Sequence, residues 1–144
     1  MPAMKFGTIE QSDIIPDAKP VEVYDAFVNA KKHAAFTGAG ATSDTRVGGE
    51  YSAWDGYITG RYVALETGKR IVQEWQTTEW PADTPPSRLE LRFELNDAGT
   101  LMTLPHTQIP SEQAPSYEQG WRDYYWTPLK KYFADKYNKK RRPV

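Results

Sequence analysis

The chain has 144 residues, of which 39% are hydrophobic and 26% charged, and its formal net charge is −1 at pH 7. These values are typical of a globular domain and give no support for a nucleic-acid or membrane-surface partner. The absence of cysteine excludes disulfides, thiolate nucleophiles and sulfur-ligated metals. No segment approaches the roughly 18 apolar residues of a membrane span, and the N-terminus lacks a signal peptide, so we expect a cytoplasmic protein.

The length suits one core, and we predict a single domain over residues 1–138. The last residues, 139–144, are basic and are expected to form a frayed, solvated tail. The alternative function of that tail is a phosphate-binding patch built from its four consecutive cationic side chains.

The first part of the chain predicts a strand followed by two helices. Residues 6–15 alternate loosely and precede Pro16, which is typical of a strand that ends at a turn. Pro20 suits the first position of a helix, and a second short helix is expected over 31–36. The buried face of the first helix is predicted to contain Val21, Tyr24, Phe27 and Val28.

The segment 42–79 predicts a meander of short strands separated by glycine turns. The strands are expected at 42–47, 50–54, 57–66 and 70–79. Asp55-Gly56 is a strong signal for a two-residue hairpin, and Gly48-Gly49 marks another turn. In the last strand every second residue points to the same face of the sheet, and we expect the face that contains Trp75 to be the interior one.

The final part predicts two more strands and a long helix. Residues 88–95 alternate strictly, which places one set in the core and the other in water. The predicted core set is Leu89, Leu91, Phe93 and Leu95, and the predicted wet set is Arg88, Glu90, Arg92 and Glu94. The next strand, 100–107, contains Pro105 and is therefore expected to be an edge or to carry a bulge. A helix over 116–137 carries an aromatic stripe that should pack on the sheet, and Pro128 should kink it. The stripe is Tyr117, Trp121, Tyr124, Tyr125, Leu129, Tyr132 and Phe133.

This order of elements predicts an α+β fold. A curved antiparallel β-sheet of about six to seven strands should wrap around the long C-terminal helix, with two short helices after the first strand. We expect a concavity between the sheet and that helix, and aromatic side chains are the residues that would line it.

Several motifs resemble one family along nearly the whole chain. They are Ile15-Pro16 and the segments 21–27, 46–51, 56–60, 69–75, 99–100, 104–107, 120–125 and 128–129. The sequence is similar to the family named for the C-terminal domain of the activator of heat-shock protein 90 ATPase, in the START/birch-pollen-allergen superfamily. The resemblance implies the helix-grip fold, and relatives with that fold commonly enclose a hydrophobic pocket.

We consider three functions, the first from the aromatic side chains on the predicted sheet and helix and the other two from the resemblance. The first is a non-enzymatic protein that binds a small apolar or aromatic ligand, and the second is an activator-like co-chaperone of heat-shock protein 90-type chaperones in the stress response. Eukaryotic activators carry an additional N-terminal domain that makes the main chaperone contact, and these 144 residues have no counterpart of it, so docking would use this domain alone. The third is an enzyme of the cyclase or hydrolase type.

The candidate ligand contacts come from the predicted sheet and the long helix. They are Trp54, Arg61, Gln73, Trp75, Phe93, His106, Trp121 and Tyr125. We assign no catalytic residue, metal or cofactor, because the two histidines have no ligand spacing and no serine lies in a nucleophile motif. The open alternatives for an enzyme are proton transfer by His106 with Glu79 or Glu118, and an interior carboxylate pair of Glu50 and Glu79.

Overall fold

The computed structural model describes residues 5–141. Its strands are β1 (Phe6–Pro16), β2 (Thr42–Ser43), β3 (Glu50–Ala53), β4 (Ile58–Glu66), β5 (Arg70–Thr77), β6 (Ser87–Asn96) and β7 (Gly99–Pro110). Its helices are α1 (Pro20–Val28), α2 (Ala30–Thr37), α3 (Ala114–Trp121), the π-helical η1 (Arg122–Trp126) and α4 (Thr127–Arg141). Within the described residues, no helix is long and apolar enough to cross a membrane.

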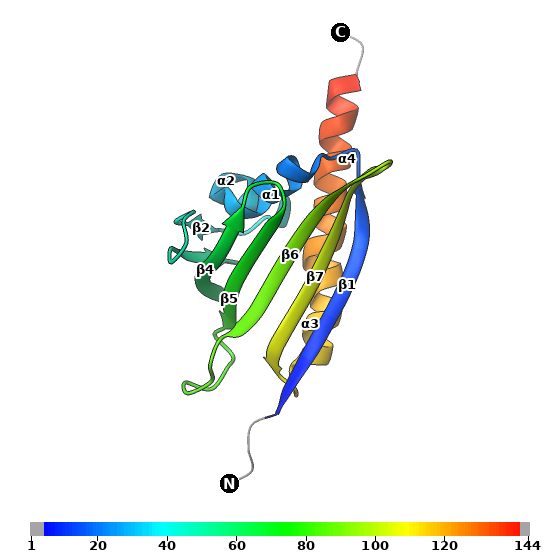
Figure 1. Ribbon diagram of the computed structural model, residues 1–144. Helices are drawn as coiled ribbons and strands as arrows, with labels where there is room; N and C mark the ends of the chain where they lie inside the picture. The colour runs from blue at the N-terminus through cyan, green and yellow to red at the C-terminus, as the bar shows by residue number, and fades with distance from the viewer. Residues whose placement is uncertain (1–4, 142–144) are drawn as a thin grey trace.

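All seven strands form one antiparallel sheet in the order β1-β7-β6-β5-β4-β3-β2. Figure 1 shows this sheet curving in front of the C-terminal helix, with α1 and α2 beside its upper end. The predicted α+β fold, with a curved sheet, a long C-terminal helix and two short helices after the first strand, is confirmed. The inner face of the sheet packs on the helices and forms the core.

In the central strands every second side chain points to the core, and the buried residues named below are the ones that were predicted. In β5, Ile71, Gln73 and Trp75 are buried, while Gln76 is exposed. In β6 the same rule buries Leu89, Leu91 and Phe93. The predicted orientation of Trp75 toward the interior is therefore confirmed.

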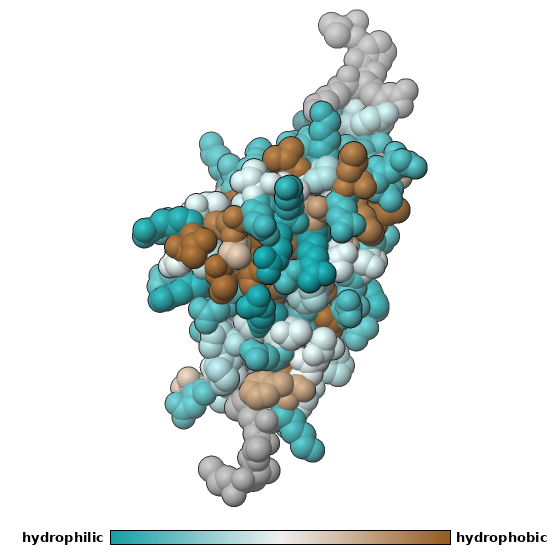
Figure 2. All heavy atoms as spheres, viewed as in Figure 1, coloured by the Kyte–Doolittle hydropathy of each residue, from teal (hydrophilic) through white to brown (hydrophobic). Residues whose placement is uncertain are grey.

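The outer face of the sheet is mainly hydrophilic, as Figure 2 shows, but one of its acids is not in water. Glu90 was expected on the wet face and is only 8% exposed. Arg70 from β5 and Arg92 from β6 cover its carboxylate and donate hydrogen bonds to it. These bonds lower the pKa of Glu90 against the opposing effect of burial.

Three residues predicted for the core are exposed. They are Val21 at 48%, Tyr124 at 58% and Leu95 at 82%. Val21 lies in the first turn of α1, beside the β4–β5 turn at Gly68. Leu95 lies at the end of β6 next to the β6–β7 turn, where it borders an open space between the sheet and α4 instead of packing on the helix.

The meander differs from the prediction at two places. The strand expected at 42–47 is only β2, because residues 44–49 form a turn in which Gly48 has a φ of 85°. The two-residue hairpin at Asp55-Gly56 is instead a four-residue connection, since β3 ends at Ala53 and β4 begins at Ile58. Consecutive positive φ angles at 54–56 turn the chain there.

The strand that contains Pro105 lies in the interior of the sheet, so the prediction of an edge strand is wrong. β7 pairs with β1 on one side and β6 on the other. Its pairing with β6 is interrupted between Leu89↔His106 and Arg92↔Thr103, because proline has no N–H to donate to the neighbouring strand. The alternative prediction, a bulge, is confirmed nearby, because Thr107 and Gln108 of β7 lie opposite the single residue Thr8 of β1, and Gln108 has a φ of 61°.

The C-terminal helix is continuous but contains a wider turn. In η1 the backbone N–H of Thr127 donates to the carbonyl of Arg122, five residues earlier. This turn directly precedes Pro128, where a kink was predicted, and the helix continues through Arg141. The predicted boundary between residues 138 and 139 thus falls inside α4, and residues 142–144 of the expected tail lie outside the described residues.

Candidate functional site

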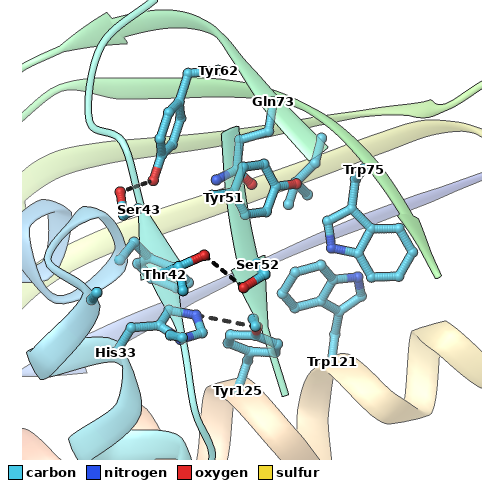
Figure 3. A pocket seen from close by; sticks show the side chains of 15 residues that line it. His33, Thr42, Ser43, Tyr51, Ser52, Tyr62, Gln73, Trp75, Trp121 and Tyr125 are labelled. Carbon is cyan, nitrogen blue, oxygen red and sulfur yellow. Dashed lines mark hydrogen bonds between the residues drawn. The ribbon is translucent and has the colours of Figure 1, made fainter. Parts of the chain in front are cut away.

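The space between the sheet and the helices is almost completely filled. The cavity that remains has a volume of about 20 Å³, which holds about one water molecule. Figure 3 shows its walls, which include the aromatic side chains of Tyr51, Trp75, Trp121 and Tyr125. A ligand-sized chamber, which the aromatic loading led us to expect, does not exist at this place because those same rings occupy it.

The cavity wall includes one buried amide that has no protein partner. Gln73 of β5 is 6% exposed and lines the cavity, with its side chain beside Tyr51 in Figure 3. Among the described residues, its amide makes no hydrogen bond, whereas the Tyr51 hydroxyl donates to the carbonyl of Glu74 at 2.7 Å. A single water in the cavity would supply one hydrogen-bond partner to the Gln73 amide.

His33 of α2 also lines this cavity. Its Nε2 lies 3.2 Å from the hydroxyl of Tyr125, so one of these two groups donates a hydrogen bond to the other. Its Nδ1 is buried and has no hydrogen-bond partner among the described residues. Burial lowers the pKa of His33 to about 4, so the ring is neutral.

His106 lies at the centre of a buried hydrogen-bond chain and not on the cavity wall. The indole N–H of Trp121 donates to its Nδ1 at 3.2 Å, which leaves the ring proton on Nε2. Nε2 donates to the hydroxyl of Ser87 at 2.7 Å, and that hydroxyl donates to the carbonyl of Trp75. Burial lowers the pKa of His106 to about 3. The expected partners Glu79 and Glu118 take no part in this chain.

A much larger space lies outside, as a groove at one end of the sheet–helix interface. It has a volume of about 680 Å³ and is predominantly apolar, which is the size range of ligand sites. Its walls come from the β3–β4 connection, β5 and the residues that follow it, α3 and η1. We call it the aromatic groove; its lining residues are Trp54, Tyr57, Ile58, Trp75, Glu79, Ser116, Tyr117, Gly120, Trp121, Tyr124 and Tyr125.

Trp54 reaches the groove from a strained backbone. Its φ is 54°, in the left-handed region that bulky residues rarely adopt. Asp55, the next residue, holds the connection in place through two hydrogen bonds with Gly40. Its carboxylate accepts from the N–H of Gly40 at 2.8 Å, and its own N–H donates to the carbonyl of Gly40 at 3.0 Å. The indole packs edge-to-face on Tyr124 at 5.4 Å between ring centroids. Strain of this kind gathers at functional sites.

The opposite wall is fixed by Tyr117 of α3. Its hydroxyl accepts a hydrogen bond from the Trp80 indole at 2.7 Å and lies 3.1 Å from the Thr77 hydroxyl. Its ring packs edge-to-face on Trp75 at 5.2 Å. Trp75 and Trp121 separate the groove from the small inner cavity, because both line the two spaces.

The structure distributes the eight candidate contacts among different places. Trp75, Trp121 and Tyr125 line both spaces, Gln73 lines the inner cavity and Trp54 lines the groove. Their role as ligand contacts stays a prediction.

The other three candidates lie elsewhere. Phe93 is packed in the core against Tyr24 and Phe27, and His106 is enclosed. Arg61 does not reach either space, since it is exposed and pairs with Glu50 across β3 and β4.

The groups suggested for an enzyme do not come together. Glu50 is exposed on the outside, so it forms no interior pair with Glu79, which lies at the rim of the groove. Glu118 pairs with Arg122 on the helix surface. Within residues 5–141, no group of three acidic or histidine side chains could hold a metal ion.

Sequence reasoning missed several residues of these sites. His33 was noted only as the second histidine, although its spacing of three from the buried Phe36 is a helical-face signal. Tyr57 comes from a turn, where no periodic pattern singles it out, and Tyr117 was assigned to the aromatic stripe of the helix rather than to a ligand site. Tyr124 was assigned to the core stripe and instead lies exposed on the groove wall.

A curved antiparallel sheet closed by one long helix, with an aromatic groove at its end, defines a helix-grip protein. The chain belongs to the family described as Activator of Hsp90 ATPase homolog 1-like protein, whose model matches residues 17–134. The family resemblance found in the sequence is therefore confirmed.

Curated relatives with activator names are similar to this chain. The activator of 90 kDa heat shock protein ATPase homolog of Dictyostelium discoideum is 32% identical over 104 residues, which are 72% of this chain and 27% of that protein. The homolog 1 protein of Homo sapiens is 30% identical over 115 residues, 80% of this chain and 34% of that protein. The chain thus spans about a third or less of the length of these relatives.

Solved structures share the fold. An HSP90 activator from Plasmodium falciparum superposes with a TM-score of 0.76 at 20% identity, covering 92% of this chain and 97% of that one. A protein from Mesorhizobium loti gives a TM-score of 0.71 at 15% identity, with 92% and 98% covered.

Proposed function

We propose that this protein binds a small, largely apolar molecule in the aromatic groove. The observation that carries the proposal is the lining of the groove, in which seven of the eleven residues are aromatic, in a space of about 680 Å³. The strained conformation of Trp54 supports the same site, since it presents an indole to the groove at a conformational cost of about 1–3 kcal/mol. The inner cavity, at about 20 Å³, is too small to hold such a molecule.

Tryptophan fluorescence and thermal shift test this function with a panel of lipids and aromatic metabolites. A responding compound should bind at least about ten-fold more weakly to Trp54→Ala and Tyr124→Ala, because each substitution removes a ring of the wall. Leu95→Ala is the matched control, since it removes an exposed apolar side chain that does not line the aromatic groove. Equal binding to all variants, or no response across the panel, contradicts the proposal.

The second candidate function is docking on a heat-shock protein 90-type chaperone and stimulation of its ATPase. Family membership supports this function, and the domain would act by itself or together with other domains or proteins. The chaperone ATPase is measured with and without the purified chain, and with Tyr124→Ala to ask whether the groove is the docking face. Unchanged turnover together with no co-purification contradicts this function.

A further inference from the structure

The aromatic groove contains one charged side chain among its lining residues, and that charge is negative. Glu79, which follows β5, is the only acid in the lining, and no lysine, arginine or histidine contributes to it. The remaining polar groups are the hydroxyls of tyrosines and of Ser116. The electrostatic character of the groove is thus set by aromatic ring faces and one carboxylate.

Glu79 has a hydrogen-bond donor but no cationic partner. The hydroxyl of Tyr57 donates to its Oε2 at 2.6 Å. Within residues 5–141, no basic side chain forms an ion pair with it, in contrast to Glu90 and Asp13, which pair with Arg92 and Lys130. The second carboxylate oxygen of Glu79 therefore remains available to a ligand.

Tyr57 reinforces this arrangement. Burial and the hydrogen bond to Glu79 raise the pKa of Tyr57, so its hydroxyl keeps its proton and fixes the carboxylate at the groove rim. The aromatic walls are equally fixed, by the edge-to-face pairs of Trp54 with Tyr124 and of Trp75 with Tyr117. A ligand meets a pre-formed arrangement, which limits the ordering cost of binding.

A cation suits this site better than a neutral group or an anion. The faces of indole and phenol rings carry negative electrostatic potential and attract ammonium groups, and several rings around one cation form an aromatic cage. A carboxylate at the rim adds a direct charge–charge attraction. An anion would meet the ring faces and Glu79 with no compensating charge.

We propose that the aromatic groove binds small molecules that carry an alkylammonium group on an otherwise apolar body. The ammonium group lies against the ring faces near Glu79, and the apolar body extends along Trp121 and Tyr124. This inference rests on the proposed function, because both use the same groove, and it specifies the charge of the ligand.

The test uses three probes of matched shape: choline, its uncharged carbon isostere 3,3-dimethylbutan-1-ol, and the anion 3,3-dimethylbutanoate. Binding to the full chain is followed by NMR titration of the indole N–H signals at low ionic strength. Choline should bind about ten-fold more tightly than the alcohol, and the anion more weakly than either. Glu79→Gln should reduce the preference for choline about three-fold, whereas Glu94→Gln, which removes a charge from the outer face, should leave it unchanged.

The outcomes separate this inference from the proposed function. Equal or tighter binding of the alcohol, with loss of binding in Trp54→Ala, overturns the cation preference and leaves the apolar site standing. No saturable shift with any probe, together with no response in the wider panel, overturns both. Self-association of the ligand-free chain that Tyr124→Ala abolishes would assign the groove to a second copy and overturn the inference as well.

Discussion

The two histidines are buried without a charged partner, and this couples the stability of the protein to pH. His33 is 7% exposed and His106 is fully enclosed. Burial lowers their pKa values to about 4 and about 3, from an ordinary value of 6.5. A second proton on His106 would have to go to Nδ1, toward which the Trp121 indole N–H already points. Protonation of the folded state would therefore break the buried chain.

The sign follows from these pKa values. Between pH 6.5 and about 4 the unfolded chain binds protons on both histidines and the folded chain does not, so the free energy of unfolding falls as the pH falls. At pH 5, about 1.5 units below the ordinary histidine pKa, each histidine lowers the free energy of unfolding by about 2 kcal/mol relative to pH 7. The two together remove about 4 kcal/mol, a large part of a typical stability of about 5–15 kcal/mol.

Urea unfolding at pH 7 and pH 5 measures this loss. His106→Gln and His33→Gln should each be less stable than the parent at pH 7, yet each should lose only about 2 kcal/mol on going to pH 5. NMR titration of the histidine ring signals in the folded protein gives an independent reading, and both should stay unprotonated down to pH 5. The reasoning is refuted if the parent and both variants show the same pH dependence, or if either ring titrates near pH 6.5 while folded.

Three substitutions test the packing that holds the sheet and helix together. Gly60→Ala should destabilise the fold by roughly 1–3 kcal/mol in urea unfolding, because a Cβ there would approach the backbone carbonyl of Glu74 to 1.8 Å; an unchanged midpoint would contradict this contact. Gly120→Ala should instead stabilise it by about 0.5–1 kcal/mol, since α3 has room for the methyl group, and a lower midpoint would count against it. Glu90→Gln should lower stability by about 1 kcal/mol by weakening the pairing with Arg92, with a smaller difference in 1 M salt; a salt-independent loss would rule out the ion pair.

The core of the central strands could be predicted because it follows from a period of two. Leu89, Leu91 and Phe93 alternate with charged residues, and one buried face requires this pattern. The period does not tell where the covering layer ends, so Leu95 has the parity of the core and is 82% exposed. Nor does it show that Arg70, on the neighbouring strand, closes over Glu90.

The site was less predictable than the fold, because aromatic content does not distinguish a filled core from a lined cavity. Trp75, Trp121 and Tyr125 were correctly expected between sheet and helix, but their rings fill that space to within about 20 Å³. The groove forms only where the β3–β4 connection, with Trp54 at a φ of 54°, meets the helix. A positive φ at tryptophan opposes its intrinsic preference, so local sequence rules predict an ordinary turn there.

The wide turn of the C-terminal helix depends on a contact that lies even farther away in the sequence. Pro128 has no N–H to continue an ordinary helical turn, and the chain forms η1 just before it. Gln11 of β1 contacts the helix before this turn and at its end: its Nε2 donates to the carbonyl of Glu118 in α3 at 2.8 Å, and its Oε1 accepts from the Trp126 indole at 2.7 Å. Since η1 contains Tyr124 and Tyr125, a side chain on the far edge strand helps to direct the rings of the groove. The proline indicates where the helix is disturbed, but only the pairing of β1 with β7 brings Gln11 to that turn.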